Sequence, residues 1–115
     1  MGMVERGDIV IVNFEPVKGH EQGGTRPAVV IQNNLGNIYS PLTIVAPITS
    51  KIFNKTYHTN VFLRSEDSKL GRDSTVMLNQ IRTIDKRRIK KIIGALDLDT
   101  MKRVDLAVKI SLGLN

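Results

Sequence analysis

A polar loop in this chain leads through an arginine and a proline directly into an apolar strand. The segment is EQGGTRPAVVIQN, residues 21–33. Its paired glycines permit unusual backbone angles, Pro27 fixes its own φ, and residues 28–31 form a buried apolar run. This layout holds the guanidinium of Arg26 at the mouth of a rigid sheet. A planar, permanently charged group in that position is suited to binding phosphate. The alternative is a hairpin loop with a solvated arginine at its base.

Short strands separated by turn residues are expected along most of the chain. Apolar patterns bounded by Gly and Asn predict strands at residues 8–14, 28–32, 43–48, 59–64, 75–81 and 89–95. Residues 98–112 are expected to form a helix, with Asp97 or Asp99 as its N-cap. The pattern favours one mainly β (α+β) domain over residues 1–115, with a small closed or nearly closed sheet.

The final helix is apolar over more than half of its circumference. A surface helix needs an apolar face of only about 100°. We therefore expect this helix to bury two sides, one against the sheet and the other against a second copy or a partner. Its apolar residues are Met101, Val104, Leu106, Ala107, Val108, Ile110, Leu112 and Leu114.

Composition favours a polyanionic partner and excludes several classes of site. The net charge of +6 attracts phosphate backbones, although basic residues also serve solubility. The chain has only two Tyr, three Phe and no Trp, too few for a broad base-stacking surface. The absence of cysteine excludes disulfides and thiolate metal sites and suits the cytoplasm. No apolar stretch approaches the roughly 20 residues of a membrane span, so no membrane segment is expected.

Other catalytic chemistries find little support in the sequence. His20 and His58 are the only histidines, and we expect both to be solvated rather than to form a two-histidine ribonuclease site. No cluster of His, Cys or carboxylate residues has the spacing of a metal site. A Gly-rich phosphate loop followed by Lys and Ser or Thr is also missing. The sequence predicts no metal and no cofactor.

Three blocks besides the loop carry a family resemblance. They are RGDIVIV at residues 6–12, YSPLTIVAPITS at 39–50 and RDSTVMLNQIRTIDK at 72–86. In this order and spacing the chain resembles the MazF/PemK family of toxin ribonucleases from bacterial toxin–antitoxin systems, over essentially its whole length. The resemblance implies a small SH3-like β-barrel with helices packed on it, paired as a homodimer. It also implies a cognate antitoxin partner, and we expect this to be an acidic, partly disordered segment.

The resemblance also implies a set of site residues. The family's catalytic arginine and threonine fall on Arg26 and Thr49. RNA-binding or supporting positions are expected at Glu21, Gln22, Asn33, Ser50, Lys51, Lys55, Ser74 and Gln80. Relatives usually carry Glu where this chain has Asn79, which changes the local charge and bears on base preference.

The implied reaction is a sequence-specific, metal-independent cleavage of single-stranded RNA. A ribose 2′-hydroxyl attacks the adjacent phosphorus, and Arg26 and Thr49 stabilise and orient the phosphate. Neither residue is a suitable base, so the proton goes either to Glu21 or to a water molecule. Two alternatives lack this reaction: a CcdB-like toxin that binds a topoisomerase, and a non-catalytic SH3-like module that only binds RNA. Relatives of the first kind lack the arginine–threonine pair.

Overall fold

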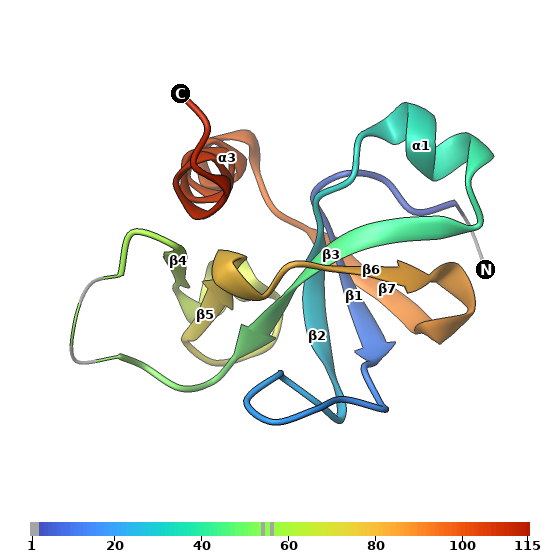
Figure 1. The fold of residues 1–115 in the computed structure, drawn as a ribbon. Helices are drawn as coiled ribbons and strands as arrows, with labels where there is room; N and C mark the ends of the chain where they lie inside the picture. The colour runs from blue at the N-terminus through green and yellow to red at the C-terminus, as the bar shows by residue number, and fades with distance from the viewer. Residues whose placement is uncertain (1–2, 54, 56) are drawn as a thin grey trace.

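The computed structural model describes residues 3–53, 55 and 57–115. It is a mainly antiparallel β structure with a helix at its C-terminus (Figure 1). Its elements are β1 (Asp8–Asn13), β2 (Thr25–Val30), α1 (Asn34–Tyr39), β3 (Leu42–Thr49), β4 (Asn60–Leu63), α2 (Ser65–Ser68), β5 (Ser74–Met77), η1 (Leu78–Gln80), β6 (Arg82–Asp85), η2 (Lys86–Arg88), β7 (Ile89–Ala95) and α3 (Leu98–Leu112). No helix in these residues is both long and apolar enough to cross a membrane.

One long strand, β3, connects the two parts of the sheet. Its first half pairs with β6 from Leu42 to Val45, and its last two residues pair with β5. Its other edge pairs with β2. The strand order is therefore β4-β5-β3-β2-β1-β7, with β6 also on β3. The barrel is an open one, because in the described residues β4 and β7 end the order and do not pair with each other.

The core has two apolar clusters because successive residues of a strand point to opposite faces. Ile9 of β1 packs into the cluster that α3 covers, whereas Val10 and Val12 pack into the other cluster. Alternation in β2 is similar, with Val29 on the first side and Ala28 on the second. Both faces of the central strands are thus buried, and this fixes their register.

The C-terminal helix begins and packs largely as its sequence predicts. The N-cap is Asp97, whose Oδ1 accepts a hydrogen bond from the Thr100 backbone N–H at 2.8 Å. Met101, Val104 and Ala107 are buried against the sheet. The widened apolar stripe is left uncovered, with large side chains exposed at Leu98, Leu106, Ile110, Leu112 and Leu114.

All six expected strands are present, and all except the strand at 89–95 have shifted ends. The shift in β2 matters for the site, because this strand starts at Thr25 and Arg26 and Pro27 therefore belong to the strand rather than to the loop. Both residues pair with β1, where Val12 lies opposite Arg26. The expected strand at 75–81 is also wrong in its second half, since the chain turns into η1 at Leu78.

The sequence prediction missed the short elements, and α1 and β6 are the two with the clearest physical explanation. Residues 33–37 were interpreted as turns, but Asn33 caps α1 by accepting a hydrogen bond from the Gly36 N–H at 2.7 Å. Asn37 is fully buried, and its Oδ1 accepts a 2.7 Å hydrogen bond from Thr43. The strand β6 is only four residues long and gains its structure from the edge of β3, a contact that local sequence does not reveal.

We predict that Asp97 makes folding stability depend on pH in acid. Its pKa is lowered chiefly by the backbone hydrogen bond from Thr100. The stabilisation is therefore complete above the ordinary aspartate pKa of about 4 and is lost as pH falls below it. Asp97→Asn should keep the cap and flatten this dependence, whereas Asp97→Ala should lower the melting temperature at neutral pH by a few degrees. Thermal melts of the three proteins between pH 3 and 7 test this, and an unchanged acid slope in Asp97→Asn would contradict it.

Candidate functional site

The structure fixes Arg26 through both its backbone and its side chain. The backbone lies in the ladder between β1 and β2, opposite Val12. The side chain is half-buried, and its Nε donates a 2.7 Å hydrogen bond to the Gly23 carbonyl. Gly24, with φ of +76°, turns the loop so that its carbonyl accepts from the Phe14 N–H. The guanidinium is thus aimed by a loop closed onto the sheet, and its Nη atoms make no hydrogen bond within the described residues.

Thr49 is the last residue of β3 and lines the same cavity as Arg26. The β2–β3 ladder ends at the pair Ala28–Pro47. Arg26 and Thr49 each lie two residues beyond this pair, and Thr49 itself pairs with β5. The Thr49 Oγ1 accepts a 3.2 Å hydrogen bond from the Lys51 N–H, which orients the hydroxyl group.

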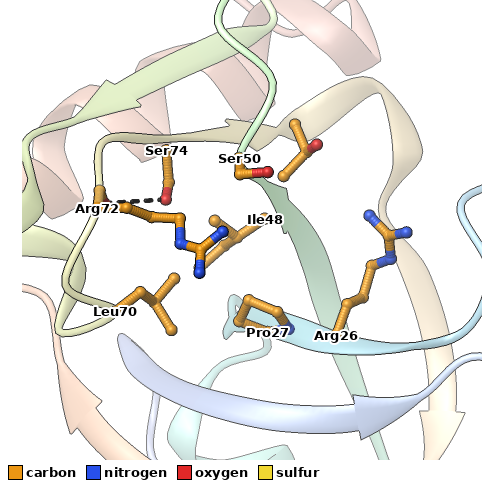
Figure 2. Close-up of a pocket in the computed structure, with 8 residues that line it drawn as sticks. Arg26, Pro27, Ile48, Ser50, Leu70, Arg72 and Ser74 are labelled. Atoms are coloured by element: carbon orange, nitrogen blue, oxygen red, sulfur yellow. Dashed lines mark hydrogen bonds between the residues drawn. The ribbon is translucent and has the colours of Figure 1, made fainter.

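Arg26 and Thr49 line one cavity of about 380 Å³, which we call the Arg26 cavity (Figure 2). Polar groups come from two arginines and three hydroxyl side chains, and the lining includes no carboxylate. Such a site favours an anion, because cations and hydroxyl donors face it without a competing negative charge. The lining residues are Arg26, Pro27, Ile48, Thr49, Ser50, Leu70, Arg72 and Ser74.

A second cavity of about 320 Å³ adjoins the first and shares Thr49 with it. We call it the Gln80 cavity. The Gln80 Oε1 accepts a 3.1 Å hydrogen bond from the Gln22 N–H, which joins the first loop to η1. Amides, a cation and two aromatic rings are available here to contact bases. The lining residues are His20, Gln22, Thr49, Lys51, Phe53, Tyr57, Asn60, Met77, Asn79 and Gln80.

Most of the residues predicted from the sequence lie in or beside these two cavities. Arg26, Thr49, Ser50 and Ser74 meet in the Arg26 cavity, and Gln22, Lys51 and Gln80 in the Gln80 cavity.

Three predicted residues lie outside the two cavities. Glu21 lines a separate hollow beside Gln22 and Gln80, and its carboxylate accepts a hydrogen bond from the Lys18 N–H. Lys55 lines a hollow together with Phe53 and Tyr57, which also belong to the Gln80 cavity. Asn33 is not brought to the site. It caps α1, beyond the end of β2 opposite to Arg26.

Several lining residues were not among the predicted site residues, and Arg72 and His20 are the two that can carry a charge. Arg72 was noted only as the first residue of the block at 72–86, yet it lines the Arg26 cavity. His20 was expected to be solvated. It is exposed, but it also lines the Gln80 cavity with Thr49. The described residues contain no group of three or more His, Cys, Asp or Glu side chains arranged to hold a metal ion.

Comparison with known proteins identifies the family. Residues 5–112 match the family described as "PemK-like, MazF-like toxin of type II toxin-antitoxin system". The chain belongs to this family. Because the match covers nearly the whole domain, the toxin assignment applies to the fold and the cavities together.

Solved structures of this toxin family share the fold. MazF from Deinococcus radiodurans (Form-I) has 30% identity and a TM-score of 0.85, covering 99% of this chain and 100% of its own. MazE-MazF (Form-II) from the same organism has 30% identity and a TM-score of 0.77, with full coverage of both chains. An endoribonuclease in complex with its cognate antitoxin from a Mycobacterial species has 20% identity and a TM-score of 0.80, covering 97% of each chain, and this likeness concerns the fold. The SH3-like, MazF-like fold is thereby confirmed.

Proposed function

We propose that this toxin is a cytoplasmic endoribonuclease that cleaves single-stranded RNA and thereby inhibits translation and growth. The observation that carries the proposal is that Arg26 and Thr49 line one cavity together with a second arginine and two more hydroxyl side chains. Membership in the toxin family and the likeness to a Mycobacterial endoribonuclease agree with it.

The reaction follows from the charge that must be stabilised. The 2′-hydroxyl oxygen attacks the adjacent phosphorus, the bond to the 5′ oxygen of the next nucleotide breaks, and a 2′,3′-cyclic phosphate and a free 5′-hydroxyl result. Negative charge increases on the non-bridging oxygens as the attack proceeds. The Nη donors of Arg26 stabilise this charge, since its Nε is already held by Gly23. The Thr49 hydroxyl donates to the same phosphate and fixes its orientation for in-line attack.

Two protons must move during the reaction, one from the 2′-hydroxyl and one to the leaving 5′ oxygen. Arg26 stays protonated and Thr49 is a poor base, so neither accepts the first proton. Glu21 lines the hollow next to the Gln80 cavity, and a water molecule is the other candidate.

RNA recognition is assigned to the Gln80 cavity and its borders. Unpaired bases are read through hydrogen-bonding edges and stacking, and this cavity offers Gln22, Asn79, Gln80 and the rings of Phe53 and Tyr57. The two rings meet edge to face at 5.7 Å, and the Lys51 ammonium lies 4.9 Å from the Phe53 ring centre. With Asn79 in place of the usual Glu, the cavity lacks one negative charge near the bases.

The toxin is further proposed to act as a homodimer that a cognate antitoxin neutralises. Leu106 is 60% exposed and Ile110 45% exposed on the outer face of α3. Leu35 and Ile38 on α1 are exposed as well, and α1 and α3 lie on the same side of the molecule in Figure 1. A two-fold contact through this side would cover these side chains. An acidic antitoxin segment would compete with RNA for the same cations.

The first prediction concerns metal independence. Cleavage of single-stranded RNA should persist in excess EDTA, because arginine and threonine supply the charge stabilisation. It should stop when the ribose at the cut position is replaced by deoxyribose, since the nucleophile is then missing. Gel analysis of a labelled oligonucleotide measures both effects, with the all-ribose strand as the control. Loss of cleavage in EDTA with recovery in magnesium would contradict the mechanism.

The second prediction concerns Arg26. Arg26→Ala should lower kcat by about 10²–10³-fold, the range for removing one preorganised donor to a developing charge. Arg26→Lys should recover little, because an ammonium group cannot reproduce the planar pair of donors. Melting temperatures should stay close to that of the unaltered chain. If the lysine variant cleaves nearly as well as the unaltered chain, Arg26 serves only as a general positive charge.

The third prediction concerns the subunit contact. Leu106→Asp or Ile110→Asp should give monomers with greatly reduced cleavage, because a charge on the outer face of α3 would be buried without a partner. Lys90→Asp, at an exposed position on β7 and away from α3, is the control and should remain dimeric. Sedimentation analysis distinguishes monomer from dimer. If both Leu106→Asp and Ile110→Asp remain dimeric, the subunit interface does not lie on α3.

A further inference from the structure

A second arginine shares the Arg26 cavity and has no role in the mechanism above. Arg72 lies in the turn between α2 and β5, on the opposite wall from β2. Figure 2 shows its side chain pointing into the cavity beside Ile48, separate from the Arg26 guanidinium at the edge. In the described part of the chain, Arg72 forms no ion pair with a carboxylate. Its charge is therefore available to a ligand.

The backbone beneath Arg72 is held unusually firmly for a surface turn. Its carbonyl accepts hydrogen bonds from the Ser68 hydroxyl at 2.9 Å and from the Ser74 hydroxyl at 3.2 Å. Both serines are buried. The neighbouring Asp73 is turned away from the cavity, because its carboxylate accepts a 2.9 Å hydrogen bond from the Ser65 N–H. The turn thus presents the arginine to the cavity and withholds the adjacent negative charge.

The positions of the two arginines suit two phosphates better than one. Arg26 extends from β2 at the edge of the cavity, apart from Arg72. Arg72 extends from the other wall over an apolar floor of Pro27, Ile48 and Leu70. Arg72 is an exposed residue, so its attraction for an anion weakens as the salt concentration rises. An RNA strand that places one phosphate at Arg26 and Thr49 carries its neighbouring phosphates along the backbone in both directions.

We propose that Arg72 binds the RNA phosphate next to the scissile one and so positions the strand without touching the reacting atoms. This inference rests on the proposed ribonuclease function. As a contact made equally before and during the reaction, it contributes to substrate binding and leaves the chemical step unchanged. Arg72 is therefore a positioning residue, distinct in its kinetics from Arg26.

Steady-state kinetics and binding test this role. Arg72→Ala should raise KM about 10- to 100-fold, the range for a lost hydrogen bond to a charged group, with kcat nearly unchanged. In binding titrations of Arg72→Ala with a short unstructured RNA, the negative slope of log K against log salt should become shallower by about 0.7, the value for one lost phosphate contact. Arg72→Lys should keep that slope, since the charge remains. Lys109→Ala removes an exposed cation that lines neither cavity, and it should leave both KM and slope close to those of the unaltered chain.

A substrate with one phosphate neutralised identifies the partner of Arg72. Methylphosphonate is introduced on either side of a mapped cut site, one position at a time. At one of the two positions, the modified RNA should bind the unaltered toxin more weakly than the unmodified RNA does. The Arg72→Ala variant should bind both RNAs equally, because the contact is already missing, as in a double-mutant cycle. Equal losses for both proteins at both positions would overturn the inference, as would a fall in kcat without a change in KM. Failure of the unaltered chain to cleave RNA would overturn the proposed function instead, and the salt slope would still test Arg72.

Discussion

The pairing of β3 with β2 is the constraint on which the site depends. Arg26 and Thr49 are far apart in the sequence, yet each lies two residues beyond the Ala28–Pro47 pair that ends the ladder, and both line one cavity. That register is fixed by burial, because a slip of one residue would turn Val29 and Ala46 from one apolar cluster to the other. The buried core thus positions the strands that carry Arg26 and Thr49, and the loops supply the other residues of the site.

The electrostatic character of the site comes from what it excludes as well as from what it contains. Arg26 and Arg72 face the Arg26 cavity, whereas nearby carboxylates are engaged elsewhere. Asp73 accepts from Ser65, Glu21 from Lys18, and Glu15 from the Gly24 N–H. Each of these hydrogen bonds shapes a turn and at the same time removes a negative charge from the cavity lining. The positive groups are therefore already in place before a phosphate binds, so the site needs little reorganisation during the reaction.

The final helix has a different relation to function. Its inner face closes one side of the core through Met101, Val104 and Ala107, and it touches η1, the segment that ends at Gln80. Its outer face exposes Leu106 and Ile110. A subunit contact on that outer face would therefore be connected to the Gln80 cavity through α3 and η1. This connection is a physical reason for dimerisation to affect cleavage.

Much of the fold could be predicted from the sequence, because strand patterns and the amphipathic period of α3 are local properties. The proposed catalytic pair came only from the resemblance to a family, since no local pattern reveals which residues of two strands line one cavity. Asn33 was assigned to the site but caps α1, because an Asn after a strand serves as well for capping as for binding. Arg72 was missed for the opposite reason. The position of Arg72 in the cavity depends on the buried serines that hold its turn, and those contacts exist only in the folded chain.

The central claim is that the arginine–threonine cavity activates an internal 2′-hydroxyl of RNA. Mass spectrometry of the products of a short RNA, taken at early times, tests this claim most directly. The account predicts a 2′,3′-cyclic phosphate on the upstream fragment and a free hydroxyl at the 5′ end of the downstream fragment. A 3′-hydroxyl together with a 5′-phosphate would show that water attacks the phosphorus and that the 3′ oxygen leaves. That result would contradict the account.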